Sequence, residues 1–158
     1  MVKPIPDGFS SVTVSLIVKD AASAIEFYKK AFLAEEMYRF LGPDGKSIMH
    51  AEVKIGNSII MISDEMPQMN CLSPLTIGGA GAAIYLYVED ADETFKRAIS
   101  SGAKPVMPIM DAFWGDRWGS IIDPFGHTWS IATHKTDMTM DEIKKAGEAL
   151  FKQMAEKR

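Results

Sequence analysis

The chain has 158 residues, of which 47% are hydrophobic and 24% charged, a balance typical of one folded domain rather than a disordered segment. Its formal net charge of −4 lacks the basic excess that binding to a phosphate backbone requires, so nucleic acid is excluded as an expected partner. A single cysteine, Cys71, excludes an internal disulfide, and no apolar run approaches a membrane span. Pro4 and Pro6 fall where a signal peptide needs an apolar run, and we expect a cytoplasmic protein.

Residues 12–35 and 82–105 share one pattern. Each begins with a run that alternates with a period of two, reaches a Val-x-Asp-Ala stop, and continues with apolar residues at helical spacing. Asp20 and Asp90 stand where a helix N-cap is expected. The pattern therefore predicts a strand followed by a helix, twice.

Three strand-like runs follow each predicted helix and are separated by turn residues. Each half is therefore predicted to have the order βαβββ, with halves at 10–64 and 82–134. The connector at 65–81 is rich in Gly, Pro and Met, and we expect it to be flexible. The runs of the first half are EEMYRFL, SIMHAEVKI and SIIMIS; those of the second are PVMPIM, a run ending before Asp123-Pro124, and HTWSIAT.

Strand alternation sorts these side chains into an aliphatic row, on which a helix can pack, and a mixed row. The mixed row includes Thr13, Glu52 and Tyr85. A polar row can simply face solvent. The tyrosines and small residues favour instead a half-buried concave surface, with apolar walls and a few polar groups.

All three tryptophans lie in WGDRWGSIIDPFGHTW (114–129), where Asp-Pro-Phe-Gly predicts a tight turn. Trp118 alternates with Arg117, and we expect it to pack beneath a helix; Trp129 is expected in the core. Trp114 precedes the strand, where its indole is placed to flank a ligand at the rim.

The tail at 139–157 is predicted to be an amphipathic helix. Thr139 and Glu142 have the spacing of a capping box. The apolar stripe must be buried on its own domain or on a partner chain, and a two-fold homodimer is the commoner partner. The stripe comprises Ile143, Ala146, Leu150, Phe151 and Met154.

The motifs AIEFYKKAF, MHAEVKIG, LYVEDADETFKRAISSGA and WGDRWGSIIDPFGHTWSIATH resemble the vicinal oxygen chelate superfamily, which includes glyoxalase I, extradiol dioxygenases and bleomycin-resistance proteins. They are most similar to its PhnB-like branch, and the resemblance covers residues 10–134. It implies an α+β fold in which two βαβββ repeats form an open, cup-shaped mixed sheet, here with an added C-terminal helix. It also implies a binding site inside the cup and a dimer.

The resemblance places divalent-metal ligands of the superfamily at Thr13, Glu52, Ala83 and Ser130. Only Glu52 is a strong ligand, because alanine cannot coordinate and hydroxyls are poor substitutes for imidazole or carboxylate. We therefore expect no metal and no cofactor. The inward row that the resemblance implies is Thr13, Ser15, His50, Glu52, Tyr85, Arg117, Thr128 and Ser130.

Glu52 is the candidate catalytic residue, as a general base. The alternative is a structural ion pair of Glu52 with Arg117 or Lys54. We expect His127 and His134 at the surface or packed against the turn. The candidate ligand-binding residues are His50, Tyr85, Trp114, Arg117, Thr13 and Ser130.

Three functions fit these residues. The first is a dimeric, metal-independent protein of the sequestration or resistance type that binds a small molecule in the cup. The second is a lyase, isomerase or dioxygenase that uses Glu52, either without metal or with a metal held by Glu52 and His50. The third is a partner-binding subunit whose cup is empty.

Overall fold

The structure is a computed structural model that describes residues 2–157. The first repeat comprises β1 (Ser15–Val18), α1 (Ala21–Phe32), β2 (Glu35–Leu41), β3 (Ile48–Ile55) and β4 (Ser58–Asp64). The second comprises β5 (Ala83–Tyr87), α3 (Ala91–Ser100), β6 (Lys104–Asp111), β7 (Asp116–Ile122) and β8 (Thr128–His134). The final helix, α4, spans Met140–Glu156.

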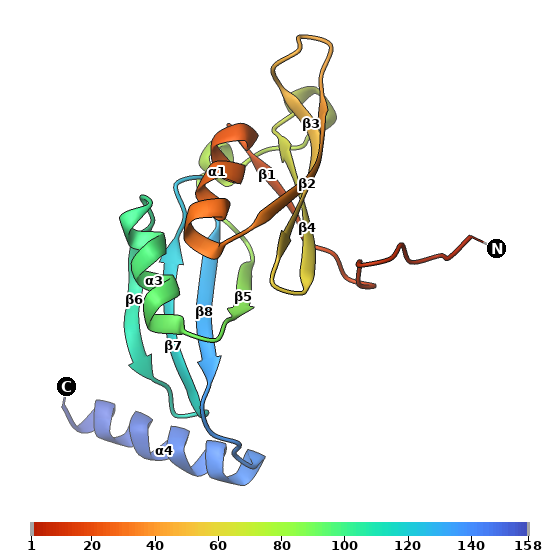
Figure 1. The fold of residues 1–158 in the computed structure, drawn as a ribbon. Coiled ribbons are helices and arrows are strands. Elements are labelled where there is room, and N and C mark those ends of the chain that lie inside the picture. The colour runs from red at the N-terminus through yellow and green to blue at the C-terminus, as the bar shows by residue number, and fades with distance from the viewer. Residues whose placement is uncertain (1, 158) are drawn as a thin grey trace.

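Each repeat forms its own four-stranded mixed sheet, with the orders β1-β4-β3-β2 and β5-β8-β7-β6 (Figure 1). The β1–β4 and β5–β8 pairs are parallel, and the others are antiparallel. The predicted α+β fold of two βαβββ repeats with a C-terminal helix is therefore confirmed.

The helix starts follow the sequence signals. The Asp20 carboxylate accepts a hydrogen bond from the Ser23 backbone N–H, and Asp90 does the same for Glu93. Thr139 and Glu142 form the complete capping box at the start of α4. These side chains satisfy N–H groups that have no partner within the helix, and so they fix where each helix begins.

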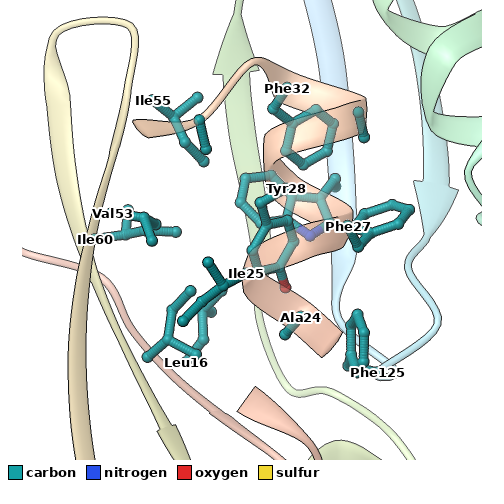
Figure 2. Packing of buried hydrophobic residues seen from close by; sticks show 14 of the residues in the cluster. Leu16, Ala24, Ile25, Phe27, Tyr28, Phe32, Val53, Ile55, Ile60 and Phe125 are labelled. Atoms are coloured by element: carbon teal, nitrogen blue, oxygen red, sulfur yellow. The ribbon is translucent and has the colours of Figure 1, made fainter. Parts of the chain in front are cut away.

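The core lies between α1 and the first sheet and continues across to the second repeat. In Figure 2, Ile25 of α1 points toward Val53 and Ile60 of the sheet, whereas Phe27 points toward Phe125 of the second repeat. Trp129 is fully buried, as predicted, and its ring centroid lies 4.6 Å from that of Phe32.

Asp123, the first residue of the Asp-Pro-Phe-Gly turn, joins the two repeats. Its Oδ2 accepts hydrogen bonds from the Tyr28 hydroxyl of α1 at 2.7 Å and from Trp129 Nε1 at 2.9 Å. Its Oδ1 accepts the backbone N–H groups of Phe125 and His127. The buried carboxylate therefore has four donors, which offset the cost of removing it from water.

His127 packs at the same junction, in agreement with its expected turn-packing role. Its Nε2 lies 3.0 Å from the backbone carbonyl oxygen of Ile17 in β1. The turn that follows β7 therefore contacts both α1 and β1 of the first repeat.

The connector has more local structure than its composition predicts. It contains a 3₁₀ turn at Pro67–Met69 and a short helix, α2, at Pro74–Ile77. The Glu65 carboxylate accepts hydrogen bonds from the Ser73 backbone N–H and the Thr76 hydroxyl. These local bonds, together with the burial of Pro74, hold the segment.

Helix α4 lies beside the turn that joins β6 to β7, at the end of the second sheet away from the Asp123 turn (Figure 1). Gly147 is its one fully buried residue among those described, and it faces the Phe113 ring. Phe151 makes an edge contact with Phe113, yet Phe151 and Met154 are more than half exposed. Much of the predicted stripe is therefore uncovered. Across residues 2–157, no helix has the length and apolar composition needed to cross a membrane.

Candidate functional site

Strand register places Glu52 on the face of the first sheet that points away from α1. Glu52 lies in line with Tyr38 of β2 and Met61 of β4, and Met61 is in line with Ser15 of β1. The alternate residue Val53 is completely buried in the core. Glu52 therefore belongs to the face without a helix, as predicted.

The partner of Glu52 is His50. His50 Nε2 lies 3.2 Å from Glu52 Oε1, because positions two apart on a strand share a face. Tyr38 borders the pair, with its ring centroid 6.4 Å from that of His50. The alternative in which Glu52 forms an ion pair with Arg117 is wrong, because Arg117 has other partners.

The second sheet carries an aromatic face on the side opposite α3. Tyr85 is in register with Ser130, as predicted, and Ser130 with Ser120. Tyr87 is aligned with Ala132 and, through it, with Trp118. We use the name "aromatic face" for this surface, which comprises Tyr85, Tyr87, Trp114, Asp116, Trp118, Ser120 and Ser130.

Arg117 does not belong to this face, and its expected inward position is wrong. It is aligned with Thr133 on the helix side of the sheet. Its guanidinium donates two hydrogen bonds to Asp92 of α3, at 2.8 and 2.9 Å, and a third to Asp111 at 3.3 Å. The bonds to Asp92 raise the pKa of Arg117. The fork of Arg117 is occupied by carboxylates of its own chain.

The predicted position of Trp118 beneath a helix is also wrong, because Trp118 lies on the aromatic face. It is in register with Ala132 on one side and Met110 on the other, and its ring centroid is 5.5 Å from that of Trp114. The Nε1 atom of Trp118 is buried and has no hydrogen-bond partner within the described part of the chain.

Asp116 is the centre of the aromatic face, and the sequence reasoning missed it. Its Oδ2 accepts hydrogen bonds from the Tyr85 hydroxyl (3.1 Å), the Tyr87 hydroxyl (3.0 Å) and Trp114 Nε1 (3.1 Å). Its Oδ1 lies 2.8 Å from His134 Nδ1. The side chain is 2% exposed. A carboxylate in the same alternating row as Trp118 is the signal that identifies it.

The hydrogen bonds set the charges of this cluster. Burial opposes ionisation of Asp116, but the bonds from His134 and the two tyrosines outweigh it and lower the pKa of Asp116. Burial, with the adjacent Asp116, raises the pKa of Tyr85 to about 12 and also raises the pKa of Tyr87. The phenols therefore remain protonated donors to a carboxylate anion.

His134 extends the cluster toward α4. Its Nδ1 faces Asp116 and its Nε2 lies 3.0 Å from Asp137, in the segment that leads into the helix. Hydrogen bonds to Asp116 and then Asp137 raise the pKa of His134. His134 is half exposed, as expected for a surface histidine, but it bridges two carboxylates.

The four positions at which the family holds a metal do not fit one here. The Thr13 hydroxyl donates to the Ser10 carbonyl oxygen at 2.9 Å, and Ala83 offers no ligand atom. Glu52 remains the one strong ligand of the four, with Ser130 a weak one. Within residues 2–157, no three side chains of His, Cys, Asp or Glu converge in a way that would hold a metal.

An open cleft of about 890 Å³ lies between the two repeats. Its walls include Phe32 and Lys54 from the first repeat and Arg97 from α3. Tyr87 and His134 also line it, so the cleft adjoins the aromatic face.

Comparison with known proteins gives relatives over most of the chain. The protein Rv0887c of Mycobacterium tuberculosis is 46% identical over 134 residues, which cover 83% of this chain and 78% of that protein. The structure of TioX from Micromonospora sp. ML1 has a TM-score of 0.61 at 29% identity and covers 79% of this chain and 98% of that one.

A PhnB protein from Bacillus cereus has the same fold, with a TM-score of 0.60 at 16% identity over 78% of this chain and 99% of that one. The family model described as Glyoxalase/Bleomycin resistance protein/Dioxygenase superfamily matches residues 10–131. The chain therefore belongs to the glyoxalase/bleomycin resistance protein/dioxygenase superfamily, as its sequence motifs predict.

Proposed function

We propose that this chain binds a small molecule on the aromatic face, without a metal, in a sequestration or resistance role. The observation that carries the proposal is the convergence of Tyr85, Tyr87 and Trp114 on the buried Asp116 carboxylate. Such a surface combines apolar area with a few fixed polar groups, which is the composition of ligand sites. Tyr85 and Tyr87 are 45% and 60% exposed and so remain accessible.

The proposal includes a homodimer in which a second copy covers the faces without helices. On the first sheet, Tyr38 and Phe40 are more than half exposed, although both are large and apolar. Such a surface is costly in water unless it is covered. β1 and β5 each pair with one neighbour among the described strands, so each leaves an edge for another chain. A dimer of this kind would complete the cup between chains.

The expected partners are thus a small molecule and a second copy of the chain. The free thiol of Cys71 fits a reducing compartment, and we propose the cytoplasm.

Acid–base catalysis at Glu52 is the second candidate function. It is favoured by the contact of Glu52 with His50, since a histidine 3.2 Å from a carboxylate can exchange a proton with it. A lyase or isomerase of the superfamily would use Glu52 as the base. This second candidate places the reaction on the first sheet, at Glu52, whereas the first places ligand binding on the aromatic face of the second sheet.

Metal titration distinguishes the metal-independent binding protein from an enzyme that holds a metal at Glu52. Zn²⁺, Ni²⁺ and Mn²⁺ are titrated calorimetrically into protein stripped with a chelator and dialysed, with Glu52→Gln as the paired variant. We expect no stoichiometric binding to either protein, because the family positions lack donors. One tightly bound metal per wild-type chain, lost in Glu52→Gln, would contradict the metal-independent function and favour the enzyme.

A further inference from the structure

The hydrogen-bond directions at Asp116 limit the chemistry that the aromatic face can recognise. The hydroxyl protons of Tyr85 and Tyr87 and the N–H of Trp114 all point to Asp116 Oδ2. The phenol oxygens therefore offer lone pairs outward, because their protons are already engaged. The two phenol oxygens can therefore accept hydrogen bonds from a ligand, whereas the N–H of Trp114 is already engaged and its nitrogen cannot accept one.

The faces of the aromatic rings are also electron-rich, like the phenol oxygens. Aromatic faces carry negative potential, and cations bind over them. The rings of Tyr85 and Tyr87 are tilted by 44° with centroids 5.1 Å apart, and those of Trp114 and Trp118 make an angle of 65°. Ala132 lies between Tyr87 and Trp118 in the strand register, so a small side chain separates the two large rings. Three of these residues therefore bond the buried carboxylate, and the fourth, Trp118, lies against Trp114.

The two cationic side chains next to Asp116 in sequence or by hydrogen bond, Arg117 and His134, are already paired. Arg117 lies on the opposite side of the sheet and is bound by Asp92 and Asp111. His134 is shared between Asp116 and Asp137, so its charge is matched by two carboxylates. An anionic ligand beside Asp116 would therefore meet a carboxylate and ring faces, whereas the ammonium of Lys54 lines the adjoining cleft.

We infer that the aromatic face binds an organic cation, an alkylated ammonium group on an apolar body. This inference rests on the proposed function, since it names the ligand class of that site. The cation would lie over the Tyr87 and Trp118 rings. The negative charge of Asp116 beneath the rings would attract it. The buried N–H of Trp118 adds one donor, suited to an oxygen on the same ligand.

Three probes of nearly equal shape test this inference: choline, its neutral isostere 3,3-dimethylbutan-1-ol, and the anion 3,3-dimethylbutanoate. Each is titrated into the ¹⁵N-labelled full chain, and the three tryptophan indole N–H signals are followed. We expect choline to shift the signals of Trp114 and Trp118. The signal of Trp129 stays in place, because that indole is buried on Asp123. Choline should bind at least about tenfold more tightly than the alcohol, as expected for a cation held by several ring faces.

Two variants of Tyr87 distinguish the contribution of its ring to choline binding from that of its hydroxyl. Tyr87→Leu should weaken choline binding by about tenfold or more, whereas Tyr87→Phe retains the ring and most of the binding. Tyr87 is 60% exposed, so neither change should disturb the fold. Arg117→Gln is the matched control on the opposite side of the same sheet, and it should leave the choline affinity unchanged.

Equal or tighter binding of the alcohol or the carboxylate at Trp114 and Trp118 would overturn the cation class while leaving a small-molecule site in place. Carboxylate binding that is lost in Arg117→Gln would overturn it as well. If none of the probes shifts these signals, the inference fails, whereas the proposed function is decided separately by the ligand found on the purified protein.

Discussion

Asp123 and Asp116 are two buried carboxylates with different roles. Asp123 binds Tyr28 of the first repeat and Trp129 of the second, so its role is to join the halves. Asp116 binds side chains that are partly exposed on one face of the second sheet. The partners of Asp123 are buried, so its role is structural. The partners of Asp116 are partly exposed, so Asp116 fixes side chains that a ligand can reach.

Tyr28→Phe should lower the free energy of unfolding by about 1.5–3 kcal/mol. The change removes a buried hydroxyl from a carboxylate, and bonds to charged groups contribute this much. Burial and the adjacent Asp123 raise the pKa of Tyr28 well above its usual range, which marks how tightly this proton is held. Denaturant unfolding measures the loss, with Tyr38→Phe on the exposed face as the control. Equal effects of the two variants would contradict the role of Asp123.

His134→Gln should change the pH dependence of stability. The folded protein raises the pKa of His134 above 6.5 through its bonds to Asp116 and Asp137. Its protonated form therefore adds stability that is fully present below about pH 6.5 and is lost as pH rises through the raised pKa. Thermal unfolding from pH 5.5 to 9 should show wild type and variant converging at high pH. A constant difference at every pH would exclude this linkage.

At the scale of the elements, the caps and the alternation of side chains predict the helices and the strands. Asp20, Asp90 and Thr139 each supply a side-chain oxygen to backbone N–H groups, a local interaction that the sequence alone reveals. The local structure of the connector was not predicted, because the contacts of Glu65 with Ser73 and Thr76 depend on the path of the chain.

The site could be predicted only in part, because a period of two tells which residues share a face but not which face a helix covers. The sequence places Arg117 and Trp118 on opposite faces correctly. Register with β8 then decides the sides, since Arg117 is aligned with Thr133 and Trp118 with Ala132. Asp116 escaped prediction because its four partners come from β5, β8 and the loop before β7.

Gly147→Leu should displace α4 from the β6–β7 turn and lower the free energy of unfolding by about 1–3 kcal/mol. A Cβ atom added at Gly147 would lie 3.0 Å from the Phe113 ring, so a larger side chain overpacks this contact. Ala149→Leu is the control, because Ala149 is exposed on the same helix. Limited proteolysis of the tail, together with thermal unfolding, measures both. Similar behaviour of the two variants would show that the Phe113 contact does not hold α4.

At the scale of the whole molecule, the two repeats meet through α1, α3 and the turn at Asp123, while the faces without helices remain uncovered. The exposed aromatic residues on both sheets are the surface that the second copy would cover in the proposed dimer. Sequence motifs predict the dimer through the resemblance, and the exposed faces of the single chain give it a physical reason.

Phe40→Glu should convert the proposed dimer to a monomer. Phe40 is 56% exposed in one chain, and a carboxylate there would be buried without a partner in the dimer. Sedimentation velocity at micromolar concentration should report a dimer for wild type and a monomer for the variant. Ile77→Glu, on the connector, serves as the control and should remain dimeric. A monomeric wild type would contradict the assembly outright.

Native mass spectrometry of the full chain, purified without chelators or affinity metal, tests the central claim most directly. One spectrum reports the number of chains, the metal content and the mass of any bound organic molecule. The account predicts a metal-free dimer with an additional organic mass that fragments to a cation. A dimer that carries near-stoichiometric metal and no organic ligand would contradict it.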